Sequence, residues 1–246
     1  MKPMATLLHA VSIAETDLRQ SFKSVRHVVW SLLFPIFMMF TFSFRYGTSG
    51  IDPQLAAFLV PGIVGMTAMF GSTNETMSIV WDKSLGVFDR ILAAPVSSTS
   101  IILGKTMAGA VMGMISSFVL LIIGSLIFGV SFPNIFVVPL IILLASFSFT
   151  GIGTIISGLA SEPREAMMLS NLLRFPMMFL GGVFFDISAM PLPLQYVAKA
   201  FPLTYATDAL RATSMFTVLF DAAVLLAYTV AMVMIGTVFL MRVLTR

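Results

Sequence analysis

Long apolar runs, separated by short polar turns, dominate the hydrophobic pattern of this chain. The runs cover residues 28–44, 55–81, 106–128, 135–159, 166–185 and 222–241. Each run reaches the roughly 17 residues that a helix needs to cross a bilayer. The pattern therefore predicts an all-α integral membrane protein with six transmembrane helices.

The first 26 residues have a different pattern, in which apolar positions recur at steps of three and four and charged residues fill the other faces. The apolar positions are Leu7, Val11, Ala14, Leu18, Phe22 and Val25. Such a stripe is typical of a helix in the membrane–water boundary, although a helix packed on a soluble partner has the same pattern. Because an apolar run follows at once, residues 1–26 are predicted to form an amphipathic interfacial helix.

Residues 186–216 form neither a continuous apolar run nor a polar loop. Prolines and charged residues exclude any apolar stretch long enough to span, yet aromatic residues stay frequent. Irregular backbone is tolerated at membrane depth where protein or water covers it. We therefore expect short re-entrant outer helices here, between spans five and six.

Lysine and arginine are distributed unevenly between the two sides of the predicted bundle. Six spans place both termini on one side. Of the 14 basic residues, ten fall on that side (Lys2, Arg19, Lys23, Arg26, Lys83, Arg90, Lys105, Arg164, Arg242 and Arg246), three on the other (Arg45, Lys199 and Arg211) and Arg174 within a span. The positive-inside rule therefore predicts a multi-pass protein of the cell (inner) membrane with both termini in the cytosol.

The composition supports a surface that faces lipid. Of the 246 residues, 58% are hydrophobic and 10% are charged, whereas a soluble domain has about 25% charged residues. The net charge of +3 comes from scattered residues, so no nucleic-acid partner is expected. The chain has no cysteine, which excludes disulfides and thiolate metal sites.

No catalytic motif is visible in the sequence. The only histidines, His9 and His27, lie near the amino terminus, and neither H-E-x-x-H nor G-x-S-x-G occurs. Gly104-Lys105-Thr106 matches the end of a phosphate-binding loop, but Thr99 stands where its first glycine belongs and the motif opens a membrane span. We expect Lys105 to reach the lipid headgroups instead. The chain is predicted to be no enzyme and to bind no metal.

Two charged residues lie inside predicted spans. Counting from the span ends at 1.5 Å per residue, Glu75 is about 9 Å deep and Arg174 about 13 Å deep. Charges at such depth usually face the interior of a bundle or a water-filled cavity. We expect these two side chains to approach each other between the second and fifth spans. With Asn74 they form either a static pair or part of a transport path.

Small residues occur at close-packing intervals in two spans. Gly109 and Gly113 lie in the third span, and Gly153 and Ser157 lie in the fourth. Such pairs let helix backbones approach closely, within one chain or between subunits. We favour packing within the chain.

The segment 82–100 leaves the membrane after the second span. Its apolar residues Leu85, Phe88, Ile91 and Leu92 have helical spacing, and Pro95 turns the chain back toward the membrane. A short helix here could dock a soluble partner, or simply connect two spans along the headgroups.

Three groups of residues resemble those of one transporter family. They are the segment from Phe88 to Ser97 with Leu103-Gly104-Lys105, the segment from Gly181 to Phe185 with Met190-Pro191, and the segment from Phe201 to Arg211. Together these segments resemble the membrane subunits of type-2 ABC exporters, closest to the daunorubicin-resistance-like drug exporter branch. The resemblance covers nearly the whole chain, so residues 1–246 are expected to form a single transmembrane domain.

The resemblance implies a machine of several subunits. Two membrane subunits, identical or related, would pair above two cytosolic ATPase subunits, which would bind ATP and Mg while this chain holds no cofactor. It also implies two sets of functional residues. Gly86, Phe88, Asp89, Arg90, Leu92 and Pro95 would belong to a coupling helix, and Gly181, Gly182, Phe185, Pro191, Pro202, Tyr205, Asp208 and Arg211 to the outer re-entrant segment. Ala94 and Arg174 depart from the usual pattern of the family.

The leading hypothesis is a permease that exports a drug-like, lipidic or glycan substrate, with ATP hydrolysed by another subunit. An ion-coupled secondary transporter or channel would more often have two matching halves with interrupted spans, and no internal repeat is visible. A membrane scaffold without transport is a third class. Co-purification with an ATPase would separate the first class from the other two.

Overall fold

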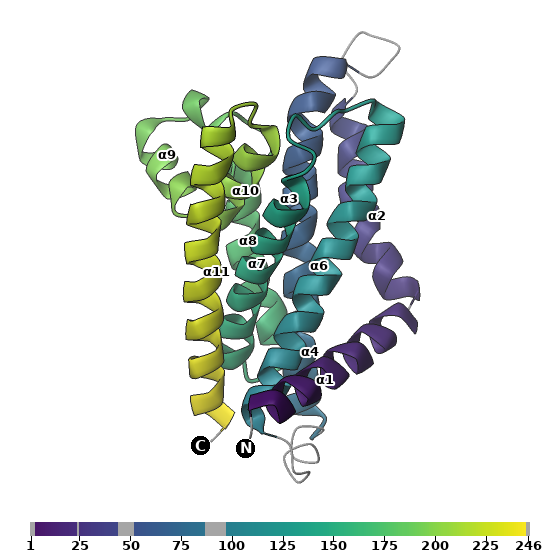
Figure 1. Ribbon diagram of the computed structural model, residues 1–246, viewed down its shortest axis with the longest axis vertical. Coiled ribbons are helices and arrows are strands. Elements are labelled where there is room, and N and C mark those ends of the chain that lie inside the picture. The colour runs from purple at the N-terminus through teal and green to yellow at the C-terminus, as the bar shows by residue number, and fades with distance from the viewer. Residues whose placement is uncertain (1–2, 24, 44–51, 87–96, 245–246) are drawn as a thin grey trace.

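The long helices of the molecule run side by side between its two ends (Figure 1). The computed structural model describes residues 3–23, 25–43, 52–86 and 97–244, and all regular structure in this part is helical. The elements are α1 Pro3–Lys23, α2 Val25–Ser43, α3 Pro53–Thr76, α4 Ser78–Ser84, α6 Ser98–Phe128, α7 Val138–Leu159, α8 Pro163–Leu180, the 3₁₀ turn η1 Ile187–Ala189, α9 Leu192–Lys199, α10 Pro202–Arg211 and α11 Met215–Leu244. The predicted all-α class is confirmed.

Four stretches of the described residues are long and apolar enough to cross a bilayer. They are Pro53–Ser84, Thr99–Phe128, Val138–Leu159 and Met215–Arg242. These stretches correspond to the predicted spans two, three, four and six. The predicted spans one and five fall on α2, which contributes the shorter apolar stretch Leu32–Phe42, and on α8, which carries the charges of Arg164, Glu165 and Arg174.

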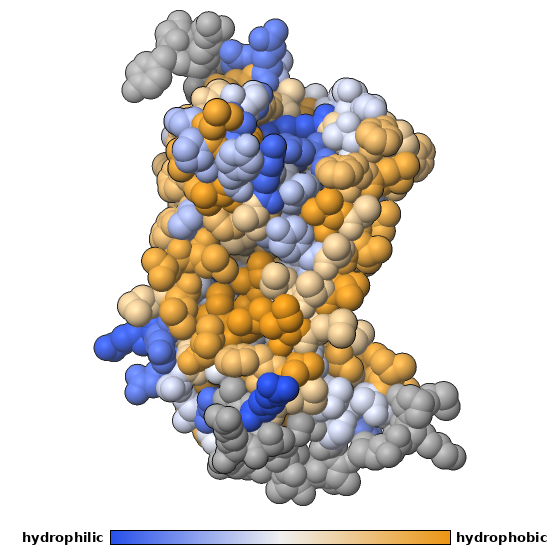
Figure 2. Space-filling model, turned by 90° about the vertical axis from the view of Figure 1, so that its left-hand side faces the viewer, coloured by the Kyte–Doolittle hydropathy of each residue, from blue (hydrophilic) through white to orange (hydrophobic). Residues whose placement is uncertain are grey.

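The outer surface exposes large apolar side chains on several helices. Leu126 of α6 is 79% exposed, Leu172 of α8 is 72% exposed, and Phe216 of α11 is 81% exposed. Figure 2 shows an apolar surface across the middle of one face, with polar residues gathered toward both ends. Soluble monomers rarely expose apolar patches of this extent. The surface is that of a multi-pass membrane protein.

The helix that contains the third span starts earlier than the apolar pattern indicates. α6 begins at Ser98, because the Ser97 hydroxyl accepts a hydrogen bond from the backbone N–H of Ser100 (3.2 Å) and caps the helix. With 31 residues, α6 is about 46 Å long, which exceeds the roughly 30 Å of a hydrocarbon core. Residues 98–105, predicted to lie before the span, are therefore part of the same continuous helix.

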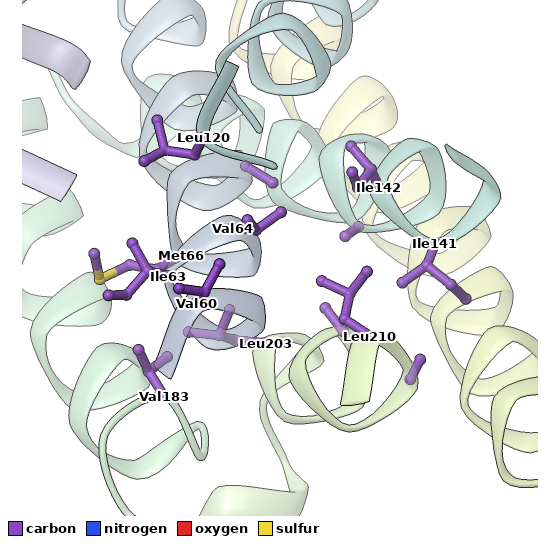
Figure 3. Packing of buried hydrophobic residues seen from close by; sticks show 14 of the residues in the cluster. Val60, Ile63, Val64, Met66, Leu120, Ile141, Ile142, Val183, Leu203 and Leu210 are labelled. Carbon is purple, nitrogen blue, oxygen red and sulfur yellow. The ribbon is translucent and has the colours of Figure 1, made fainter. Parts of the chain in front are cut away.

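The second span is the central helix of the bundle. Val60, Ile63 and Val64 of α3 are fully buried and belong to one apolar cluster. Figure 3 shows this cluster between Leu120 of α6, Ile142 of α7 and Leu203 of α10, among others. α3 is therefore enclosed by protein, and α11 covers α7 and faces outward.

Glycines allow the closest helix contacts around α3. A Cβ atom on Gly113 would lie 2.9 Å from the backbone oxygen of Ala68, and one on Gly109 would lie 3.1 Å from that of Ser72. A Cβ atom on Gly153 of α7 would collide with the Thr76 hydroxyl. The predicted small-residue packing within the chain is confirmed.

Both ends of the chain lie at the same end of the bundle, beside α1 and α4 (Figure 1). The short helices α9 and α10 lie at the opposite end. The prediction of short helices in residues 186–216 is confirmed, and their re-entrant position stays a prediction.

Candidate coupling and transport site

A buried lysine joins three helices at the end of the bundle that holds the termini. The Lys105 side chain on α6 is 2% exposed. Its Nζ lies 3.0 Å from Asp17 Oδ2 of α1 and 2.6 Å from Asp82 Oδ2 of α4, and it donates to Ser78 Oγ of α4 (3.3 Å). These oxygens account for the three N–H groups of the ammonium. The prediction that Lys105 reaches the headgroups is wrong, because α1 and α4 cover this part of α6.

Small residues allow α1 to approach Lys105. A Cβ atom on Gly104 would lie 2.7 Å from the backbone oxygen of Ala10 and 2.8 Å from Ile13 Cβ. Ala10 and Ala14 are buried on the same face of α1. Gly104 therefore permits the crossing of α1 over α6, and the adjacent Lys105 fixes it through Asp17.

The part of α1 that does not contact α6 has an apolar face and a charged face. Leu7, Val11 and Phe22 from the predicted stripe are between 45% and 58% exposed. Glu15 and Arg19 form an exposed ion pair (2.6 Å) on a different face. The helix crosses the end of the bundle at an angle to the long helices (Figure 1). Its amphipathic character is confirmed, and its position at the membrane boundary stays a prediction.

Glu75 lies next to this junction, in the wall of a pocket. The Ser21 hydroxyl of α1 is 2.8 Å from each Glu75 carboxylate oxygen, and Glu75 is 4% exposed. The pocket has a volume of about 490 Å³ and lies between α1, α3, α4 and α8. Its lining residues are Gln20, Ser21, Asn74, Glu75, Met77, Ser78, Trp81 and Met167. Asn74 and Glu75 thus line one cavity with both polar and apolar walls, and a role in a transport path stays a prediction.

Arg174 has a different environment from Glu75, and the predicted pairing of these two residues is wrong. Arg174 of α8 is 5% exposed, and its guanidinium lies over the ring of Phe70, 5.2 Å from the centroid. Among the described residues, its Nε and Nη2 atoms have no hydrogen-bond acceptor. Glu75 instead accepts a hydrogen bond from Ser21, because α1, which packs on α6, brings Ser21 beside the end of α3.

The outer segment is held to the bundle through Arg211. Its Nε donates to the backbone oxygen of Phe58 in α3 (2.9 Å), and Nη1 and Nη2 donate to those of Gly182 (2.7 Å) and Val183 (3.1 Å). The guanidinium also lies 3.8 Å from the centroid of the Phe58 ring. Gly182 has a φ of +76°, which favours glycine and turns the chain after α8.

The other residues predicted for this segment also lie at this end of the bundle. Gly181 accepts a hydrogen bond from the Thr207 hydroxyl (2.9 Å), and Tyr205 donates to the Lys199 backbone oxygen (2.8 Å). Pro202 begins the buried helix α10, which also carries the partly buried Asp208. Pro191 precedes α9, and Phe185 is 60% exposed.

Asp186, at the start of η1, forms a hydrogen bond within the outer segment. The backbone N–H of Ser188 donates to Asp186 Oδ1 (2.8 Å) and lowers the pKa of that carboxyl.

Comparison with known proteins decides the family. The family model for the ABC-2 type transporter matches residues 11–216, which is most of the chain. This chain belongs to the ABC-2 type transporter family. It is therefore a membrane permease subunit, and the ATPase activity of such a transporter lies outside its ABC-2 domain.

Individual relatives of this ABC-2 chain are distant. The daunorubicin resistance ABC transporter permease protein DrrB1 of Streptomyces coeruleorubidus is 23% identical over 216 residues, which cover 82% of this chain and 75% of the relative. Nodulation protein J of Sinorhizobium fredii is 23% identical over 195 residues, covering 76% and 74%. The ycf38 protein of Cyanophora paradoxa is 26% identical over 172 residues, covering 66% of this chain and 57% of the relative.

Most of the coupling residues predicted for this ABC-2 permease lie outside the described residues. These are Phe88, Asp89, Arg90, Leu92 and Pro95. Gly86, at the edge of the described part, has a φ of +66° and follows the end of α4. The flanks of the segment, α4 and the start of α6, lie at the end of the bundle that holds the termini (Figure 1).

The sequence pattern did not single out several buried or half-buried polar residues of the permease. Asp17, Ser78 and Asp82 bind Lys105 at the junction. Asp221 of α11 is 5% exposed, and its Oδ2 atom has no hydrogen-bond partner among the described residues. The sequence feature that could have predicted the contacts of Lys105 is its place directly after Gly104, because a glycine can mark the point where two helices cross closely. Asp221 was missed because the predicted span began after it.

Proposed function

We propose that this chain is the permease subunit of an ABC exporter that moves a drug-like, lipidic or glycan substrate out of the cytosol. The ATP is hydrolysed by a separate ABC ATPase subunit, which holds ATP and Mg. The match of the ABC-2 family model over residues 11–216 carries this proposal. The name of the relative DrrB1 refers to drug resistance and supports the drug-like class.

The proposed topology has six spans in the cell (inner) membrane. The four apolar stretches supply four of them, and α2 and α8, which run beside α3 and α7, supply the other two. Both termini lie in the cytosol, since the excess of basic residues is at their end. Residues 1–26 lie at the membrane boundary, and residues 186–216 form the outer re-entrant segment.

The proposed partners are an ABC ATPase below the membrane and a second permease subunit beside this one. The segment 82–100 is the coupling segment, with Gly86, Phe88, Asp89, Arg90, Leu92 and Pro95 as its contacts to the ATPase. The pocket with Asn74 and Glu75 opens the transport path, and Arg174 lies further along it, since all three are on the facing helices α3 and α8.

Purification with candidate ATPase subunits tests the proposal. We expect a stable complex that hydrolyses ATP in lipid, and we expect Phe88→Ala with Arg90→Ala to uncouple hydrolysis from transport while the protein still inserts into the membrane. Unchanged coupling in that double variant would count against the segment. Transport by the chain alone, driven by an ion gradient, would favour an ion-coupled transporter instead.

A further inference from the structure

The contacts of Lys105 connect both flanks of the coupling segment to α1. On α4, Ser78 precedes the segment 82–100 and Asp82 is its first residue, whereas Lys105 lies on α6, after the segment. Asp17 lies on α1. One ammonium group therefore binds side chains of α1 and α4 from its place on α6.

The connection is shielded from water. Lys105 is 2% exposed, and the side chains of Asp17 and Asp82 are 14% and 26% exposed. Charge-assisted hydrogen bonds at 2.6–3.0 Å are stronger than neutral ones, and removal of one partner of a buried pair leaves the other charge uncompensated. The ion pairs of Lys105 with Asp17 and Asp82 are therefore expected to be more stable than an ion pair on the protein surface.

α4 follows α3 with one residue, Met77, between them. The Met77 backbone is helical (φ −64°, ψ −20°), and its oxygen accepts hydrogen bonds from the N–H groups of Val80 (3.0 Å) and Trp81 (3.2 Å). Lys105 therefore binds the end of a nearly continuous helix that leads from the core of the bundle to the coupling segment.

We propose that Lys105 is a positioning residue that makes α1, α4 and the start of α6 move as one unit, so that a displacement of the coupling segment reaches the interfacial helix. The inference rests on the proposed function, because the ATPase supplies the displacement. α1 lies across the end of the bundle with an apolar side exposed, so its movement changes how the permease sits at the membrane boundary. The Ser21–Glu75 hydrogen bond joins α1 to α3, before Met77, and does not involve Lys105.

Lys105 links α1, through Asp17, to α4, through Asp82 and Ser78. Because Ser78 also binds the ammonium from α4, every Asp82→Ala variant in this test carries Ser78→Ala as well. Loss of the bonds on either side breaks the link, so Asp17→Ala, Asp82→Ala and the double variant should have the same effect. Independent stabilising contacts would instead have effects that add. Ser21→Ala is the matched control, because it removes a bond of α1 to α3 and leaves Lys105 intact.

The experiment follows α1 directly in the complex with the ATPase. The chain has no cysteine, so Leu8→Cys on the exposed side of α1 (62%) carries a single environment-sensitive bimane label, attached before assembly. We expect addition of Mg-ATP to change the bimane emission in the parent and in Ser21→Ala. The change should fall at least fivefold in Asp17→Ala, Asp82→Ala, the double variant and Lys105→Met, while ATP hydrolysis continues.

Each other outcome overturns the inference. The inference is contradicted if bimane emission in Asp82→Ala responds to ATP as it does in the parent. It is also contradicted if the effects of the two substitutions add in the double variant, or if the parent complex hydrolyses ATP without any change in emission. Asp82 is partly exposed, so its alanine variant provides the answer even if Lys105→Met does not fold. Failure of the parent to bind any ATPase would instead refute the proposed function.

Discussion

Two arginines of this permease that contact α3, the partly buried Arg211 and the buried Arg174, have opposite environments. Arg211 donates to three backbone oxygens at the outer end of the bundle, whereas Arg174 lies over Phe70 with two N–H atoms that have no acceptor among the described residues. A buried donor without an acceptor costs free energy, and a satisfied one stabilises. The sequence analysis placed Arg211 in the outer segment and Arg174 beside Glu75, and the contacts show that the hydrogen-bonding groups of Arg211 are better satisfied than those of Arg174.

Arg211→Met should destabilise the protein strongly. The methionine leaves the carbonyl oxygens of Phe58, Gly182 and Val183 without their donor, and each hydrogen bond to a charged group contributes about 1.5–3 kcal/mol. We expect the midpoint of thermal unfolding, measured in lipid nanodiscs, to fall by several degrees. A midpoint equal to that of the parent would contradict the role of Arg211 as a structural link.

Arg174→Met should not lower the stability of the protein, in contrast to Arg211→Met. The methionine keeps the apolar contact with Phe70 and removes an uncompensated charge, so the unfolding midpoint should stay equal or rise, by up to about 1–3 kcal/mol in stability. Transport should fall at least tenfold if the guanidinium contacts cargo in the path. A variant with lower stability and normal transport would show that Arg174 is structural.

The Asp186 carboxylate should make the outer segment sensitive to acid. Its pKa is lowered by the hydrogen bond from Ser188, so its contribution to stability is present above the pKa of the unfolded chain and is lost as the pH falls through the lowered value. Asp186 is exposed, so the effect should be under about 1 kcal/mol. Unfolding midpoints between pH 6 and pH 3 should fall less steeply in Asp186→Asn than in the parent; parallel curves would contradict this.

At the scale of elements, close backbone contacts of α3 with α6 and α7 accompany the apolar cluster around α3. Gly109, Gly113 and Gly153 each face backbone or side-chain atoms of α3 that leave no room for a Cβ. Helices in a membrane gain little from apolar burial alone, so close contact of this kind contributes much of their association. The central position of α3 depends on these glycines.

Gly113→Ala should therefore destabilise the bundle. Its Cβ would lie 2.9 Å from the Ala68 backbone oxygen, which cannot move without shifting α3. Overpacking of this kind costs about 1–3 kcal/mol. Gly65→Ala is the matched control, because its nearest neighbour, Leu203 Cδ1, lies at 3.5 Å. Equal unfolding midpoints for the two variants would contradict the packing argument.

The apolar periodicity predicted the helices well but not their contacts. It predicted the helical class, the apolar runs, the amphipathic α1 and the glycine contacts. It placed the start of α6 at residue 106 because it follows hydropathy, whereas the Ser97 cap begins the helix at Ser98. The contacts of Lys105 and Glu75 with α1 could not be predicted, since they depend on how a surface helix crosses the bundle.

At the scale of the whole molecule, the two ends of the bundle should lie on opposite sides of the membrane. The chain has no cysteine, so Lys199→Cys and Ser161→Cys each provide a single exposed thiol, one near α9 and one between α7 and α8. A membrane-impermeant maleimide added to intact cells should label position 199, and position 161 only after permeabilisation. The reverse pattern would place the termini outside the cytosol.

The central claim is that a separate ATPase energises this permease. The most direct measurement is ATP-dependent uptake of a panel of lipophilic drugs into inverted membrane vesicles that contain the permease with and without its ATPase. The account predicts uptake of at least one drug only when the permease, an active ATPase and Mg-ATP are all present. Equal uptake by vesicles that lack the ATPase, driven by an ion gradient, would contradict it.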